Sequence, residues 1–167
     1  MQLAEAATHA EELARSAGSE RELATLRAEW DDEIEAAARS GDYRVRGLAY
    51  RSIAQFRFRQ KLELLRRGLE DQSPAARGSA LIALEGLSRG HPGDINRFRP
   101  LLHELAARDP NVAVRRLAIV SLKNGTPQPD TVRLLNGLAE SDEEDREVRK
   151  TARVVGDALG KRARMAR

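Results

Sequence analysis

Residues 42–61 combine cations and aromatic rings in the way that a surface for nucleic acid would. Their sequence, DYRVRGLAYRSIAQFRFRQK, holds five arginines and one lysine among two tyrosines and two phenylalanines. Aromatic rings stack on bases and cations pair with phosphates, so this composition is typical of single-strand binding. The same segment places Val45, Leu48 and Ile53 at the spacing of an amphipathic helix. Part of the segment must therefore serve the fold.

Residues for catalysis or metal binding are sparse. The three histidines, His9, His91 and His103, lie far apart, and none follows another at the spacing of one helical turn. The chain has no cysteine, which excludes disulfides and thiolate metal sites. The acidic run 142–145 lacks the spaced ligands and turn glycine of a calcium loop. We therefore expect a non-enzymatic protein with no cofactor and no metal site.

The composition favours helices. Hydrophobic residues make up 41% of the 167 residues and charged residues 33%. Alanine, leucine, glutamate and arginine dominate, and all four are strong helix formers, so we expect an all-α fold. No apolar run approaches the roughly 18 residues that span a bilayer, and nothing after Met1 resembles a signal peptide. We expect a cytoplasmic protein that does not insert into a membrane.

Charge is segregated along the chain. Residues 1–38 hold ten acids and three bases, whereas residues 39–67 hold nine bases and two acids. Local potential decides which partners approach, so the two segments predict different surfaces.

Four segments can be aligned on an arginine. The segments read SGDYRVRGLAYRSIA, DQSPAARGSALIAL, DPNVAVRRLAIVSL and EEDREVRKTARVVG. The aligned positions, called the anchor arginines below, are Arg46, Arg77, Arg115 and Arg149. Each anchor is followed three residues later by alanine, and the anchors are 31, 38 and 34 residues apart. Periods of this size are typical of stacked helix pairs.

An apolar helical stripe precedes each aligned segment, so the repeating unit is helix, turn, helix. Gly18 closes a first helix, and Ser19 with Glu22 predicts a capping box that opens the next one. We expect a single domain over 1–167, with a capping helix in 1–18 and repeat units in 19–58, 59–90, 91–125 and 126–167. The break near residues 56–60 lacks glycine and proline.

With these residues in place, the chain resembles HEAT repeats, including the HEAT-like kind of phycobilin lyases. The pattern is Asp-Pro-x-Val-x-Val-Arg-x-x-Ala-x-x-x-Leu, carried by residues 109–122 and, with alanines for the valines, by residues 71–84. The resemblance implies an α-α superhelix, a solenoid of about four HEAT-like helix pairs with an extra N-terminal helix. Phycobilin lyases and DNA alkylation-repair glycosylases are enzymes with such repeats, but their catalytic residues have no counterpart here.

The resemblance also implies a ladder of hydrogen bonds between aspartate and arginine six residues apart. In this sequence the pairs are Asp71 with Arg77 and Asp109 with Arg115. Arginine presents a planar set of donors that matches a carboxylate, so the anchors are expected to be structural. We expect Arg115→Ala to lower the melting temperature.

In HEAT-like stacks the second helix of each pair lines the concave surface, as the resemblance implies. Tyr43 and Tyr50 are seven residues apart and are expected to share an exposed face, as are Arg44 and Arg51. The residues expected to bind a partner are Tyr43, Arg44, Tyr50, Arg51, Arg57, Arg116, Lys150 and Arg153.

Three functions fit these expectations. The first is an adaptor or scaffold that binds a protein partner with an acidic surface through a basic, Tyr- and Arg-bearing concave surface. The alternative is nucleic-acid binding through phosphate contacts along the same trough. The third is self-association, with the acidic residues 1–38 of one copy meeting the basic stretch of another.

Overall fold

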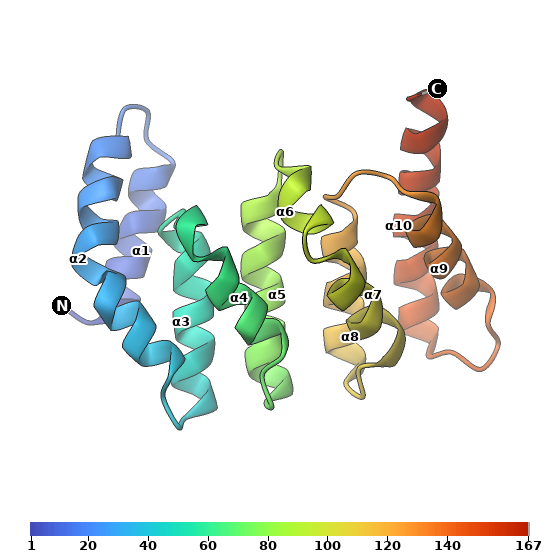
Figure 1. Ribbon diagram of the computed structural model, residues 1–167, viewed down its shortest axis with the longest axis horizontal. Helices are drawn as coiled ribbons and strands as arrows, with labels where there is room; N and C mark the ends of the chain where they lie inside the picture. The colour runs from blue at the N-terminus through green and yellow to red at the C-terminus, as the bar shows by residue number, and fades with distance from the viewer. Residues whose placement is uncertain (167) are drawn as a thin grey trace. The chain divides into compact units, whose positions relative to one another are not determined.

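A computed structural model describes residues 1–166, and its regular structure is entirely helical (Figure 1). Neighbouring helices pack in pairs, so the expected all-α helical-repeat fold is confirmed. The chain forms two compact units, Met1–Leu87 (unit 1) and Ser88–Arg167 (unit 2). The finer division into four repeat units stays a prediction. Within residues 1–166, no helix combines the length and apolarity needed to cross a bilayer.

Unit 1 begins with three packed helices and continues with a helix pair. Its elements are α1 (Leu3–Ala14), α2 (Glu20–Ala38), α3 (Tyr43–Gln55), the short 3-10 helix η1 (Arg59–Lys61), α4 (Leu62–Leu69) and α5 (Pro74–Ser88), which ends at the unit boundary. The helix α3 packs against α1, α2 and α4. Gly47 of α3 also lies against Ser79 of α5, where an added Cβ would be 3.0 Å from the hydroxyl.

Unit 2 contains two larger helix pairs. Its elements are α6 (Pro92–Asn96), α7 (Arg99–Arg108), α8 (Val112–Leu122), α9 (Pro129–Glu140) and α10 (Arg146–Met165). Figure 1 shows α9 alongside α10, and α8 packs against both α7 and α10. Proline at the first or second position of α6, α7 and α9 suits a helix start, where the missing N–H has no partner to lose.

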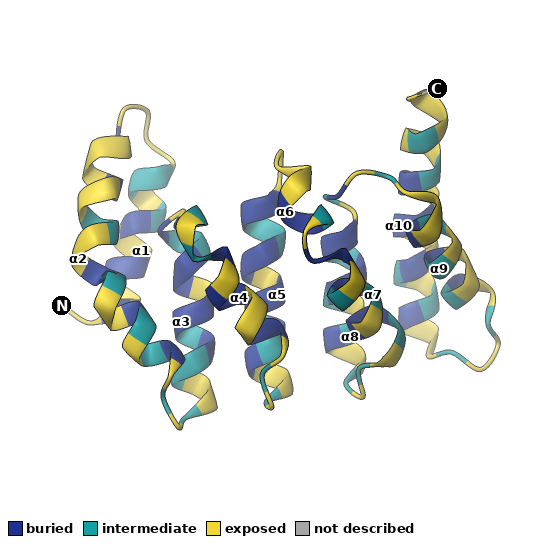
Figure 2. Ribbon diagram, viewed as in Figure 1, coloured by how far each residue is buried: buried dark blue, intermediate teal, exposed yellow. Residues whose placement is uncertain are grey.

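The aligned positions of the repeat form the core of both units (Figure 2). The alanine three residues after each anchor is fully buried in all four second helices, α3, α5, α8 and α10. These residues are Ala49, Ala80, Ala118 and Ala152. A side chain of one carbon allows close approach of neighbouring helices, which explains why the repeat returns to alanine there.

The capping box expected from Ser19 and Glu22 does not form in the structure. The hydroxyl of Ser19 makes no cap bond but donates back to the carbonyls of Leu13, at 2.5 Å, and Ser16, at 2.9 Å. Before α10 the cap is Asp145, whose carboxylate accepts from the backbone of residues 147 and 148. The first helix does not run to Gly18 as expected: it ends at Ala14 with Arg15 as its C-cap, and Gly18, with a φ of 80°, lies in the turn that leads to α2.

The chain turns after α3 without glycine or proline. Arg57 takes a φ of 52°, a left-handed conformation that is unfavourable for a residue with a Cβ. Phe58 then inserts into the core and is 7% exposed. The apolar burial of Phe58 holds the turn in place of the usual turn residues.

Candidate functional site

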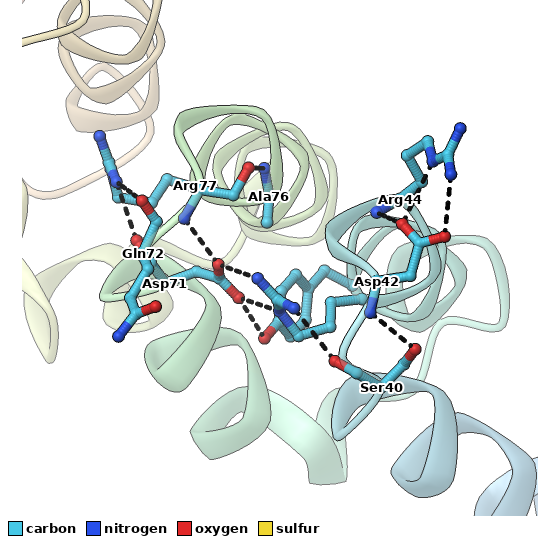
Figure 3. A network of polar contacts seen from close by, with 10 residues as sticks. Ser40, Asp42, Arg44, Asp71, Gln72, Ala76 and Arg77 are labelled. Carbon is cyan, nitrogen blue, oxygen red and sulfur yellow. Dashed lines mark hydrogen bonds and ion pairs between the residues drawn. The ribbon is translucent and has the colours of Figure 1, made fainter.

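Asp71 is the centre of a polar network at the turn between α4 and α5 (Figure 3). Arg46 donates Nε–H to one carboxylate oxygen at 2.8 Å and Nη2–H to the other at 2.9 Å. The Tyr50 hydroxyl donates to the same carboxylate at 3.2 Å, and the Ser73 amide at 2.9 Å. The hydrogen bonds from Arg46 outweigh burial and lower the pKa of Asp71. This carboxylate therefore joins α3 of one expected repeat to the turn of the next.

The other end of the network corrects the expected pairing of Asp71 with Arg77. Arg77 donates to the backbone carbonyls of Asp71 at 2.8 Å and Gln72 at 3.2 Å. The spacing of six residues therefore brings the arginine to the carbonyl of that aspartate, while the carboxylate binds Arg46, 25 residues earlier.

Unit 2 repeats this arrangement around Arg115. Its Nη1 and Nη2 donate to the two carboxylate oxygens of Glu144 at 2.5 and 2.6 Å, and its Nε donates to the Ala106 carbonyl at 2.9 Å. The hydrogen-bonded acid is thus Glu144, 29 residues later, and not the expected Asp109. Hydrogen bonding to Glu144 raises the pKa of Arg115 and lowers that of Glu144. Each rung of the ladder thus joins an anchor to an acid of the following repeat.

Tyr50, which was expected to be exposed, is buried. Its exposed fraction is 3%, and its ring lies against Gly68, where an added Cβ would be 3.0 Å from the ring carbons. Burial, followed by the charge of Asp71, raises the pKa of the hydroxyl. The position four residues after the anchor faces the following repeat, so Tyr50 is part of the ladder and is not on the partner-binding surface.

The remaining candidates on α3 and in the turn after it are exposed but differ in their partners. Tyr43 is 48% exposed, with the Arg44 guanidinium 5.9 Å from its ring centroid. Arg44 is also paired with Asp42, with Nη2 3.2 Å from the carboxylate. Arg51 is exposed, and the side chain of Arg57, in the turn after α3, donates to the Ala54 carbonyl at 3.2 Å.

The candidates in unit 2 are also exposed, and they point to different neighbours. Arg116 of α8 donates to the Thr151 hydroxyl of α10 at 3.4 Å. Lys150 follows the anchor of α10 and is exposed. Arg153 reaches the other side of α10 and donates to the Ala139 carbonyl at 3.0 Å. The structure brings Arg116 near α10 and turns Arg153 towards α9.

Much of the basic stretch 39–67 is used inside unit 1. Lys61 is 10% exposed and lies 2.5 Å from Asp31 and 2.7 Å from Glu35. Arg59 donates to the Leu87 carbonyl at 3.1 Å. Together with Arg46, these cations connect helices, and they are not available for phosphate groups.

An exposed stripe recurs on the four second helices. It comprises the positions two before and two, five and nine after each anchor, all of which are exposed or half-buried. We call it the second-helix face. In unit 1 it consists of Arg44, Leu48, Arg51, Gln55, Ala75, Ser79, Ile82 and Gly86. In unit 2 it consists of Ala113, Leu117, Val120, Asn124, Glu147, Thr151, Val154 and Ala158.

The second-helix face is unusual for its lack of charge. Only Arg44, Arg51 and Glu147 on it are charged. Away from the terminal methionines, the large hydrophobic residues that are exposed all belong to second helices: Tyr43 at 48%, Ile82 at 53%, Val112 at 39% and Val154 at 64%. The order of charges along the sequence does not reveal this face, because the stripe can be recognised only when the four repeats are aligned by their anchors.

A buried cation that sequence reasoning did not identify lies in unit 2. Arg99 is 6% exposed and donates to the Thr131 hydroxyl at 2.7 Å, the Thr126 carbonyl at 3.0 Å and the side chain of Asn96. His103 Nε2 also meets the Thr131 hydroxyl, at 2.8 Å. Burial lowers the pKa of Arg99 and the pKa of His103, and the charge of Arg99 lowers the pKa of His103 further. These bonds fix the connection between α8 and α9.

Candidate catalytic chemistry is limited in the described part of the chain. Residues 86–90 read Gly-Leu-Ser-Arg-Gly, a pattern shared with hydrolase nucleophiles, but Ser88 is fully buried at the end of α5. Its hydroxyl accepts from Asn124 at 3.0 Å, and a helix end is not the strand-to-helix turn that such a nucleophile needs. Residues 1–166 also contain no group of three or more acids and histidines that could hold a metal ion.

Residues 31–107, slightly less than half of the chain, match the family model for HEAT repeats. No curated protein matches the chain.

Proposed function

Because residues 31–107 match the family model for HEAT repeats, we propose that the chain is a non-enzymatic adaptor that binds a partner protein through the second-helix face. HEAT repeats generally mediate protein–protein interaction. The observation that supports this surface is the exposure of apolar side chains, which is concentrated on the second helices. Exposed apolar groups bordered by polar ones are typical of interaction sites.

The cations at this face suggest the chemistry of the partner. Arg51 lies on the face in unit 1, and Arg116 and Lys150 follow the anchors beside it in unit 2. Apolar contact with a few flanking cations fits an amphipathic helix whose polar edge is acidic. Tyr43 and Arg51 remain candidate partner-binding residues in this proposal, since tyrosine and arginine are frequent interface hot spots.

Nucleic acid is the weaker candidate. Phosphate binding needs several unpaired cations on one surface, and Arg46, Arg59 and Lys61 of the basic stretch are bound within unit 1. A second-helix face with few charges supports protein contact better than phosphate contact.

The test is a capture experiment with an immobilised chain and extract of its native host, with bound proteins identified by mass spectrometry. The variant Arg51→Glu, Ile82→Glu changes the second-helix face of unit 1. The control is Arg66→Glu, which changes an exposed cation on α4, the first helix of its pair. Where Arg66→Glu, Leu101→Glu folds, it serves as a second control that also carries two substitutions.

We expect a protein that binds the wild type and Arg66→Glu equally and is lost from the double variant. Circular dichroism confirms that each variant is folded. Equal binding to the folded double variant, or capture of nucleic acid in place of protein, would contradict the proposal.

A further inference from the structure

The anchor arginine of α10 differs from Arg46 and Arg115. The nearest carboxylate to Arg149 is Asp142, 4.0 Å from Nη1 and fully exposed. The Nε atom of Arg149 is buried and makes no hydrogen bond. In the two rungs described above, the acid comes from the following repeat. Among residues 1–166, no carboxylate is hydrogen-bonded to Arg149, so its Nε–H is a donor without an acceptor.

Arg149 lies on a basic face of α10. At 100° per residue, the members of this face fall within about a third of the helix circumference. They are Arg149, Lys150, Arg153, Asp157, Lys161 and Arg164, and all except the half-buried Arg149 are exposed. We call this set the α10 basic face. Its one acid leaves a strong excess of positive charge.

The same chain carries a complementary face on α2. Glu22, Glu29, Asp32 and Glu33 are exposed and lie within a similar arc of the helix. We call this set the α2 acidic face. Within residues 1–166 these four carboxylates form no ion pair, in contrast to Asp31 and Glu35 on the same helix, which bind Lys61.

The two faces also match in length. At 1.5 Å per residue, Glu22 to Glu33 spans about 16 Å, and Lys150 to Arg164 spans about 21 Å. The supporting helices have 19 and 20 residues. One helix can therefore lie along the other with every carboxylate near a cation.

We propose that a second copy of the chain docks head to tail, with its α2 acidic face on the α10 basic face and a carboxylate near Arg149. The second copy is the occupant that charge complementarity favours, because it carries the matching face at the same concentration. Such a contact joins two different surfaces, so a pair of copies still has one free α2 acidic face and one free α10 basic face. Further copies can therefore be added at either end. The proposal goes beyond the adaptor function and uses neither Tyr43 nor any residue of the second-helix face.

Sedimentation velocity over a series of protein concentrations tests this contact. At about 20 mM salt we expect the weight-average mass of the wild type to rise with concentration, and at about 500 mM salt to return to that of the monomer, since exposed charges are then screened. Lys161→Glu, Arg164→Glu reverses two exposed cations of the α10 basic face and should weaken association by about 100-fold. The control Arg66→Glu, Arg67→Glu makes the same charge change on α4 and should associate like the wild type.

Exchanging the charges of the α2 acidic face and the α10 basic face tests the contact directly. Glu29→Arg, Glu33→Arg should be monomeric by itself, and mixing it with Lys161→Glu, Arg164→Glu should restore association. If Lys161→Glu, Arg164→Glu fails to fold, the neutral variant Lys161→Gln, Arg164→Gln replaces it and should also associate less. A monomer at every concentration at low salt, or association that the α10 variants leave unchanged, would overturn the proposal. That result would leave the proposed adaptor function standing, because partner capture by the same variants measures that function separately.

Discussion

Replacing Arg115 by alanine should destabilise unit 2 more than removal of a surface ion pair would. Arg115 and Glu144 have side chains only 12% and 15% exposed, and they share two hydrogen bonds of 2.5 and 2.6 Å. The substitution would also leave the Ala106 carbonyl without its donor. Breaking a fully buried pair costs about 3–5 kcal/mol, and partial exposure here reduces the expected loss to about 2.5 kcal/mol.

The shift in melting temperature depends on how much of the chain unfolds together. Unfolding entropy is about 2.1 cal/mol/K per residue, so a loss of about 2.5 kcal/mol lowers the Tm of a unit of about 80 residues by about 15 °C. If all 167 residues unfold as one unit, the same loss gives about 7 °C. Differential scanning calorimetry measures the shift and shows the number of transitions.

Glu144→Gln and the double variant complete a thermodynamic cycle with Arg115→Ala. We expect a coupling energy of about 1.5–3 kcal/mol, as for hydrogen bonds to charged groups. A Tm within about 1 °C of the wild type for Arg115→Ala, or a coupling near zero, would refute the structural role of this rung.

Three other predictions concern packing, pH and nucleic acid. Gly68→Ala places a Cβ 2.8 Å from a neighbouring Cβ and 3.0 Å from the ring of Tyr50, so urea unfolding should show a loss of about 1–3 kcal/mol, whereas Gly86→Ala, with open space around it, should gain about 0.5 kcal/mol. Burial lowers the pKa of His103 below 6.5, so its neutral form contributes stability that is present above about pH 6.5 and is lost as pH falls through the folded pKa. The urea midpoint of His103→Gln should therefore decline less on acidification than that of the wild type. An equal decline in the two proteins would contradict this. Short single-stranded DNA should bind weakly at physiological salt, and tight binding with a steep salt dependence in mobility-shift assays would show that the paired cations are available after all.

The helices and the core could be predicted from the sequence because they depend on local patterns. The alanine after each anchor repeats with the apolar stripe, and its burial follows directly from helical periodicity. The resemblance to HEAT repeats adds the pairing of these helices. The residues that bind a partner remain proposals.

Tyr50 shows where the helical wheel is insufficient. A wheel identifies one apolar side of a helix, whereas a second helix in a stack contacts its own pair and also the following repeat. Tyr50 lies on that second contact, between Gly68 and Asp71. Its burial could be predicted only by asking which residues of the next repeat lie opposite.

The ladder shows the same difficulty at longer range. Arginine and aspartate six residues apart indicate a local pair, but the carboxylate has better access to the arginine of the preceding repeat. Arg57 is a second example. Its left-handed backbone is held by the burial of Phe58, and no glycine or proline in the sequence indicates a turn there. Both features depend on distant packing that spacing alone does not report.

The rungs have a consequence for how such a chain can change in length. In the rungs of Arg46 and Arg115, the anchor uses one acid at the turn of the following repeat, and that turn supplies one acid to the repeat before it. A duplicated or deleted repeat therefore restores both junctions without any compensating substitution. Arrays of this kind can grow or shrink by whole modules, and selection can then act on the new length of surface while the joints stay unchanged.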